Sequence, residues 1–234
     1  DIYSVSGFLG EGDPAGERNE LYRNDGGFQF TDVRSGAAYD ALAGQGVTDT
    51  DYDGDGDIDL IAANRSGRLV VLRNDGGTFS AVSAASLGID RDAASGITMA
   101  DIDTDGDQDM LLVDLDPSDL RNGHLFRNDG GTFVRIRDFN NVIGFMGGFA
   151  DLDNDQDLDL IFAGDDVSYL NDGGGSFTPG PAVPVAGIDD PRAIAFADID
   201  GDGDVDFAIG AKRSDNWLVR NNVSGANWLK VILI

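Results

Sequence analysis

The chain has 234 residues, a formal net charge of −27 and no cysteine. The negative charge argues against nucleic acid phosphates and anionic membranes as partners and favours a cation. The missing cysteine excludes disulfides and thiolate chemistry. Hydrophobic residues make up 41% of the chain, so a core is expected despite the charge, and no apolar run is long enough to cross a membrane.

Residues 1–33 have the pattern of an incomplete repeat unit. The segment DIYSVSG at 1–7 has a strand-like pattern, and LYRNDGGFQF at 21–30 predicts a hairpin, because Asn-Asp-Gly-Gly accepts positive φ between apolar runs. Residues 7–20 form the longest connection and are a candidate partner-binding loop, although a flexible loop without function fits as well. Because the chain begins at Asp1 without a signal peptide, we interpret it as a processed form or a fragment.

The segment DYDGDGDID at 51–59 places an aspartate at every second position. It recurs as DIDTDGDQD at 101–109, DLDNDQDLD at 151–159 and DIDGDGDVD at 198–206. These four loops begin 50, 50 and 47 residues apart and hold 20 of the 40 aspartates. Such concentration at a fixed period indicates a repeated site, because general surface acidity would spread the charge along the chain.

The segments around these loops predict four strands per repeat: one before the loop, one after it, and two joined by an Asn-Asp-Gly-Gly turn. Four antiparallel strands in about 48 residues are typical of a β-propeller blade. We therefore expect an all-β propeller-type domain over residues 1–234, with an incomplete blade and four full blades at 1–33, 37–83, 93–138, 142–180 and 190–234. This gives about four and a half blades, which are part of a larger propeller or form a five-bladed ring. We favour the larger propeller, because NWLKVILI at 227–234 fits as the outermost strand of the last blade.

The loop pattern D-x-D-x-D-G-x-x-D predicts a calcium site. A tight loop turns side chains 1, 3, 5 and 9 inward, position 7 offers a carbonyl, and Ca²⁺ prefers six to eight oxygens. An EF-hand needs a Glu at position 12, where this chain has only apolar residues, namely Ala62, Leu112, Phe162 and Ile209. The repeats also stand too far apart for tandem nonapeptide β-rolls. The remaining alternative, an aspartate-rich turn satisfied by its own backbone, is disfavoured by four copies.

With the loops, the "DLIAAN"-type strands and "RNDGGTF", the chain resembles the FG-GAP/VCBS repeats of integrin-α-like β-propellers. Its last residues, NNVSGANWLKVILI, resemble the junction into the UnbV/ASPIC module of cartilage-acidic-protein-like proteins. The resemblance implies a calcium-stabilised, secreted or periplasmic propeller with seven or eight blades. It implies side-chain ligands at Asp51, Asp53, Asp55, Asp59, Asp101, Asp103, Asp105, Asp109, Asp151, Asp153, Asp155, Asp159, Asp198, Asp200, Asp202 and Asp206. It implies carbonyl ligands at Asp57, Asp107, Asp157 and Asp204. Loop three departs from the family pattern, because Gln156 replaces Gly at position 6, and we expect strain there with weaker binding or altered geometry.

These features predict a non-enzymatic extracellular or periplasmic module that binds about four structural Ca²⁺ ions and serves protein interaction or adhesion. A lectin is the alternative, and a calcium-dependent polysaccharide lyase is less favoured, since the chain has one histidine and two lysines. The partner is a protein or a glycan, with no nucleic acid and no membrane insertion.

The sequence also allows predictions for several residues outside the aspartate loops. We expect His124 to be a surface residue at a strand end. The arginines before the turns, Arg23, Arg73, Arg127 and Arg220, are expected to pair with aspartates of the same or a neighbouring blade. Trp217 and Trp228 are expected to pack on outer strands, with a sugar-stacking platform as the alternative.

Overall fold

The computed structural model of the chain describes residues 2–4, 20–32, 44–64, 69–91, 94–114, 121–222 and 229–232. Within these ranges the chain forms nineteen strands and one short 3₁₀ helix at Ala84–Leu87. The strands make five antiparallel sheets, one with three strands and four with four strands. No helix in these ranges has the length and apolar character that crossing a bilayer requires.

The strands follow one another through the sheets in chain order. The three-stranded sheet contains β1 (Ile2–Ser4), β2 (Glu20–Gly26) and β3 (Gln29–Asp32). The second sheet contains β4 (Gly44–Thr50), β5 (Asp59–Asn64), β6 (Val70–Asp75) and β7 (Thr78–Val82). The third contains β8 (Gly96–Ala100), β9 (Asp109–Val113), β10 (Arg121–Asn128) and β11 (Phe133–Val142). The fourth contains β12 (Gly147–Ala150), β13 (Asp159–Phe162), β14 (Val167–Asn171) and β15 (Phe177–Ala182). The last contains β16 (Pro191–Ala197), β17 (Asp206–Ala211), β18 (Trp217–Arg220) and β19 (Leu229–Ile232).

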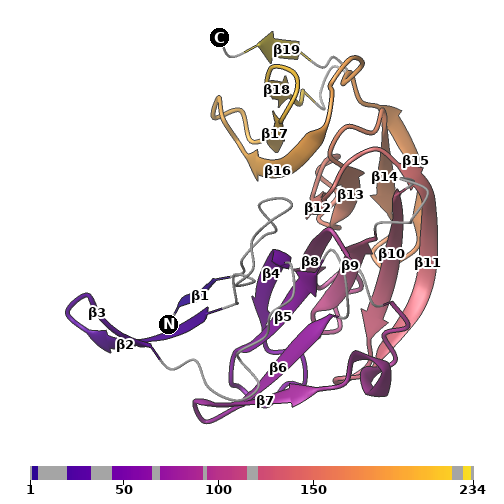
Figure 1. The fold of residues 1–234 in the computed structure, drawn as a ribbon. Helices are drawn as coiled ribbons and strands as arrows, with labels where there is room; N and C mark the ends of the chain where they lie inside the picture. The colour runs from indigo at the N-terminus through magenta and orange to yellow at the C-terminus, as the bar shows by residue number, and fades with distance from the viewer. Residues whose placement is uncertain are drawn as a thin grey trace.

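The first strands of the four-stranded sheets line the inside of an arc, and β4 contacts β8, β8 contacts β12, and β12 contacts β16 (Figure 1). Three apolar clusters fill the spaces between successive four-stranded sheets, and a smaller one lies between the first sheet and β4–β7. This is the arrangement of propeller blades, and the predicted fold class is confirmed. We call the four-stranded sheets blades B to E in chain order, and the three-stranded sheet blade A.

The ends of the described chain pair within their own blades. Strand β19 pairs with β18, with Leu218 opposite Val231, so it is the fourth strand of blade E. Strand β1 pairs with β2, with Tyr3 opposite Leu21, and the described residues place no strand on its other edge. Pairing of the C-terminal segment with β1, which a five-bladed ring would need, is therefore not seen among these residues.

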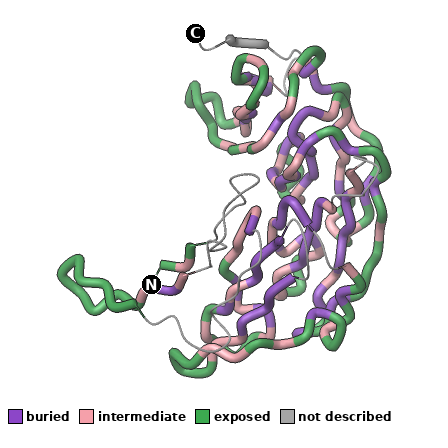
Figure 2. Tube along the Cα trace, viewed as in Figure 1, coloured by how far each residue is buried: buried purple, intermediate pink, exposed green. Residues whose placement is uncertain are grey.

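Burial is greatest along the second strands of the blades, β5, β9, β13 and β17, and the outer hairpins are largely exposed (Figure 2). Trp217 is buried in the cluster between blades D and E, as expected from packing, whereas Trp228 and residues 7–19 lie outside the described residues. The predicted turns are present: Gly76 and Gly77 have φ of 62° and 88°, a conformation that favours glycine.

The four arginines pair with aspartates of their own blades, which confirms that expectation. The pairs are Arg23–Asp25, Arg73–Asp75, Arg127–Asp129 and Arg220–Asp200.

Candidate metal centres

Each aspartate loop joins the first and second strands of a blade and is closed by its first carboxylate. In loop one, Asp51 accepts the backbone N–H groups of Asp55 at 3.1 Å and Gly56 at 3.0 Å. Loops two and three repeat both bonds at 3.1 Å. The first aspartate therefore folds the next five residues around itself, because its two oxygens satisfy two backbone donors of the turn.

The sixth loop position needs the left-handed backbone conformation that the sequence predicts. Gly56, Gly106 and Gly203 have φ of 93°, 99° and 94°, and Gln156 takes the same position with φ of 78°. A side chain in this conformation carries strain that glycine avoids. Loop three keeps these hydrogen bonds of loops one and two, and the expectation of weaker binding or altered geometry at its site stays a prediction.

The ninth loop position ties the loop to the outer hairpin. Asp59 is fully buried, and its two oxygens accept the backbone N–H groups of Tyr52 at 3.1 Å and Asn74 at 2.7 Å. The same two bonds are made by Asp109, Asp159 and Asp206 in the other loops. This carboxylate thus fixes the loop against the Asn-Asp-Gly-Gly turn of its own blade or its equivalent.

Positions 1, 3 and 9 of each loop come together, with one carboxylate oxygen from each within 4.8 Å of the others. The four triads are Asp51, Asp53 and Asp59; Asp101, Asp103 and Asp109; Asp151, Asp153 and Asp159; and Asp198, Asp200 and Asp206. Oxygens at this spacing can surround a single cation. Carboxylate oxygens are hard ligands, which suit Ca²⁺ and offer little to Zn²⁺.

Positions 5 and 7 lie outside the triads. An oxygen of Asp55 accepts the N–H of Asp57 at 2.9 Å, and the equivalent bond recurs for Asp105, Asp155 and Asp202. The side chain of Asp57 accepts the N–H of Gly76, and Asp107 accepts that of Gly130, so these carboxylates fasten the loop to the hairpin. Asp157 and Asp204 occupy the same position in loops three and four.

The third loop position carries an oxygen without a partner. In loops one to three, Oδ1 of Asp53, Asp103 and Asp153 is buried and has no hydrogen-bond donor among the described residues. Burial and then the neighbouring carboxylates raise the pKa of all three. An unpaired buried acceptor is unfavourable, so these atoms are suited to a cation held by the triad.

Burial also acts on the ninth position. It raises the pKa of Asp109 and of Asp159 to about 6, although two backbone N–H donors lower the pKa of each carboxyl. The loops without an ion are therefore clusters of carboxylates that repel one another in partly desolvated surroundings.

Loop four differs from the other three. The Nε atom of Arg220 lies 2.8 Å from Oδ2 of Asp200 at the third position, and Asp198 accepts the N–H of Gly201 at 2.7 Å. Its triad is also more exposed at the first and third positions. The positively charged guanidinium group of Arg220 therefore contacts the candidate metal site in this loop.

A family model for the FG-GAP-like repeat matches residues 51–112 and 151–209, together just over half of the chain. The chain belongs to the FG-GAP-like repeat family. The two matched segments together contain all four aspartate loops. The family match does not reach the last residues, and their resemblance to the UnbV/ASPIC junction stays a prediction.

No curated protein matches this FG-GAP-like chain. One solved structure, described as the crystal structure of BBS1N in complex with ARL6DN, soaked with lead, is similar at 13% identity with a TM-score of 0.45. The match covers 87% of this chain and 59% of the other.

An asparagine that the sequence marks only as a turn residue joins neighbouring FG-GAP-like blades. The Nδ2 atom of Asn128 in blade C donates to the carbonyl of Tyr52 in loop one, at 2.8 Å. Asn171 and Asn221 make the same contact at 2.7 Å with the second residues of loops two and three, Ile102 and Leu152. The sequence feature that could have indicated this role is the recurrence of the asparagine at the same position in every repeat.

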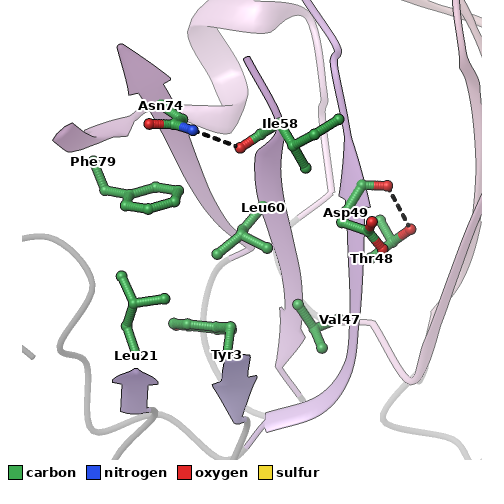
Figure 3. Close-up of a pocket in the computed structure, with 9 residues that line it drawn as sticks. All are labelled: Tyr3, Leu21, Val47, Thr48, Asp49, Ile58, Leu60, Asn74 and Phe79. Atoms are coloured by element: carbon green, nitrogen blue, oxygen red, sulfur yellow. Dashed lines mark hydrogen bonds between the residues drawn. The ribbon is translucent and has the colours of Figure 1, made fainter. Parts of the chain in front are cut away.

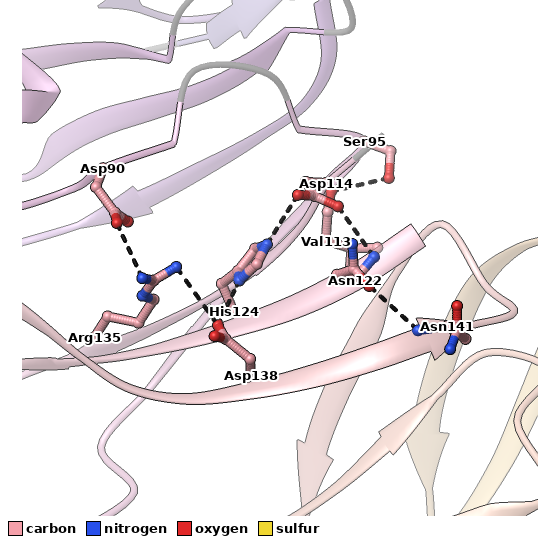
Figure 4. Close-up of polar contacts among 9 residues, drawn as sticks. All are labelled: Asp90, Ser95, Val113, Asp114, Asn122, His124, Arg135, Asp138 and Asn141. Atoms are coloured by element: carbon pink, nitrogen blue, oxygen red, sulfur yellow. Dashed lines mark hydrogen bonds and ion pairs between the residues drawn. The ribbon is translucent and has the colours of Figure 1, made fainter. Parts of the chain in front are cut away.

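A second polar cluster surrounds His124 (Figure 4). His124 is 3% exposed, so the prediction of a surface histidine is wrong. Its Nδ1 atom lies 2.7 Å from Asp138 and its Nε2 atom 2.9 Å from Asp114. Arg135 bridges Asp138 and Asp90, and the hydrogen bond from His124 lowers the pKa of Asp138. The partners stand 10 and 14 residues from the histidine in the chain, which is why the local pattern around it did not reveal them.

Proposed function

We propose that the aspartate loops bind Ca²⁺ and that these ions stabilise a propeller-type module whose role is binding and not catalysis. The observation that carries this proposal is the buried, unpaired Oδ1 atom at the third position of three triads. Asp53, Asp103 and Asp153 each have a buried carboxylate oxygen that no donor of the described chain satisfies, and a divalent cation would compensate its charge. The first and ninth aspartates supply the remaining triad oxygens, and the fifth side chain and seventh carbonyl are the further ligands expected from the family.

The stability effect follows from mass action. Extracellular calcium modules bind the ion with dissociation constants of about 0.1–1 mM. At a free calcium concentration ten times the dissociation constant, each site adds roughly 1.4 kcal/mol to the free energy of unfolding. Four such sites would add about 5–6 kcal/mol, which is comparable to the whole stability of a typical domain. We also propose an extracellular or periplasmic location, where free calcium is millimolar and would fill sites of this strength.

The test compares Asp103→Asn with Asp129→Asn. Both changes remove one negative charge from the same blade, but Asp103 belongs to a triad, whereas Asp129 is exposed and paired with Arg127. We expect Asp103→Asn to remove one ion from the calorimetric stoichiometry and to lower the calcium-dependent rise in melting temperature. In EGTA the same variant should melt no lower than the parent, because the buried charge has gone.

The control Asp129→Asn should keep the full calcium stoichiometry. Melting temperatures that are the same in calcium and in EGTA for the parent chain would contradict the proposal. A loss of stability in Asp103→Asn that is equal with and without calcium would assign the residue a structural role only.

The partner of the module is proposed to be a protein or a glycan, bound through surface loops such as residues 7–20. Calcium would then affect partner binding through the fold alone. Binding of a partner that is lost in EGTA while the melting temperature is unchanged would contradict this part of the proposal.

A further inference from the structure

The outermost strand of blade C carries two arginines that the equivalent strands of its neighbours lack. After the phenylalanine of the turn, blade C continues as FVRIR at 133–137, whereas blade B has FSAVS at 79–83 and blade D has FTPGP at 177–181. Blades B and D form the same four strands without these arginines. Arg135 and Arg137 are therefore candidates for a role particular to blade C, in a chain with 16 Lys and Arg against 43 Asp and Glu.

An irregularity in β11 directs the two arginines to opposite faces of the blade. Residues two apart in a regular strand share a face. Here Arg135 lies opposite Phe126 and Arg137 lies opposite the adjacent Leu125, so Ile136 is an extra residue in the strand. Phe126 belongs to the apolar cluster between blades B and C, and Leu125 belongs to the cluster between blades C and D. The bulge therefore places Arg137 on the side of blade D.

Arg137 is held in place by blade D, but its charge is not neutralised there. Its Nη1 atom donates a hydrogen bond to the carbonyl of Phe177. Its guanidinium carbon lies 4.6 Å from the ring centre of Phe139 and 5.6 Å from that of Tyr169. Within the described ranges it forms no ion pair with a carboxylate and no further hydrogen bond. The guanidinium stays charged at all pH values at which proteins fold, so its other N–H groups can bind an anion.

A cavity of about 360 Å³ lies beside Arg137, between the outer hairpin of blade C and the turn of blade D. Besides two glycines of that turn, it is lined by Arg127, Ile136, Arg137, Ser176 and Phe177. The two arginines and the serine supply N–H and O–H donors, and none of the described residues that line the cavity is acidic. A cavity of this size accommodates a small organic molecule.

A larger cavity, of about 450 Å³ between blades A and B, has different chemistry (Figure 3). Asp49 lines it together with Thr48 and Asn74, and the described lining residues include no cationic side chain. An anion would meet a carboxylate there instead of a guanidinium. The cavity between blades C and D is therefore the better site for an anion, although the chain as a whole has a net charge of −27.

We propose that the cavity between blades C and D binds the carboxylate group of a small organic acid. The planar guanidinium of Arg137 binds the carboxylate oxygens, and Ile136 and Phe177 contact the apolar body of the acid. Arg127 adds a weaker attraction, because Asp129 already pairs with it. One uncompensated guanidinium matches one negative charge, so a carboxylate suits this acidic chain better than a doubly charged phosphate. The site is separate from the cation triads and does not depend on the function proposed for them.

Benzoate and benzamide test the proposal as a pair of probes, because they have nearly the same shape and differ in charge. Each is titrated into the whole chain in calcium at physiological ionic strength, and the backbone amide signals of residues 174–177 are followed by NMR. We expect saturable shifts with benzoate at a dissociation constant of about 1 mM. Benzamide should bind at least about tenfold more weakly, because it lacks the charge-assisted hydrogen bonds. Absence of saturable shifts with millimolar benzoate, or equal binding of the two probes, overturns the proposal.

Two variants of β11 give a second readout. Arg137→Gln and Arg135→Gln each remove one positive charge, but Arg137 lines the cavity, whereas Arg135 pairs with Asp90 and Asp138. We expect Arg137→Gln to weaken benzoate binding at least about fivefold and Arg135→Gln to change it by less than about twofold. Equal weakening in the two variants would mean that benzoate responds only to the net charge of the chain, which overturns the proposal. The comparison of the two probes on the parent chain decides the matter if either variant fails to fold.

Discussion

The joint between blades B and C can be tested with two asparagines in identical sequences. Asn74 and Asn128 both occupy the second position of RNDGGTF. The Oδ1 atom of each accepts a glycine N–H of its turn at 2.8 Å, and the backbone N–H of each donates to the ninth loop aspartate of its blade at 2.7 Å. They differ in the Nδ2 atom, which stays within the blade for Asn74 and crosses to Tyr52 for Asn128. Alanine at each position therefore isolates the contact between blades.

The expected losses follow from burial. Asn128 is fully buried, so alanine removes two hydrogen bonds of about 1 kcal/mol each and leaves the carbonyl of Tyr52 without its donor. A buried group without a partner costs about 1–3 kcal/mol, and we expect a total loss near 3 kcal/mol. Asn74 is partly exposed, so water replaces its bonds and the loss should be about 1 kcal/mol or less.

The assay is urea unfolding followed by far-ultraviolet circular dichroism, with calcium present and equal for both variants. The difference between the two free energies of unfolding, expected near 2 kcal/mol, measures the joint. Equal losses for the two variants would show that the bond to Tyr52 adds nothing beyond the turn, and the reasoning would be wrong.

Four further outcomes are expected. Gln156→Gly should tighten calcium binding at loop three by relieving its positive φ, and calorimetry that shows unchanged or weaker binding would count against the strain. Between pH 5 and 7, the melting temperature of the calcium-free chain should fall as pH rises, because Asp109 and Asp159 have raised pKa values in the folded state and their stabilising protonation is lost near pH 6. Calcium affinity should change in the opposite sense and fall by roughly tenfold per pH unit below 6 for each proton displaced, which isothermal titration at several pH values will show. His124→Ala should lower the free energy of unfolding by about 3 kcal/mol, since Asp114 and Asp138 lose the donor between them, and a change below 1 kcal/mol would contradict that role.

The sequence predicts the parts of this fold that depend on local chemistry. Aspartates at alternate positions mark the loops, and Asn-Asp-Gly-Gly marks the hairpins, because few other residues accept those backbone angles. The fourth loop position also has positive φ, from 60° at Thr104 to 78° at Gly201, and threonine gave no signal of it. The division of each loop into triad and fastening carboxylates was not predicted, because Asp57 finds its donor at Gly76, 19 residues away.

The contacts that join blades could not be predicted from a local sequence pattern either, because their two partners lie far apart in the chain. Asn128 meets Tyr52 across 76 residues, and Asn171 meets Ile102 across 69, so both ends of the bond belong to separate repeats. A single repeat shows each half as an ordinary turn or loop. Only the packing of neighbouring blades shows that the second loop residue is buried between them and that its carbonyl accepts a hydrogen bond from the asparagine of the next blade.

These joints give the array of blades a direction. Blades B, C and D each give a loop to the next blade, and blades C, D and E each receive one from the blade before. The two ends of an open array of such blades are therefore chemically different, because one end has an unused loop and the other has an unused acceptor site for a loop. Duplication of a whole repeat regenerates the joint without new contacts, which lets such an array lengthen by simple copying. In a closed ring the last loop can pack against the first blade, so no joint is left incomplete. An open arc leaves two different surfaces, and a segment that covers one of them does not fit the other.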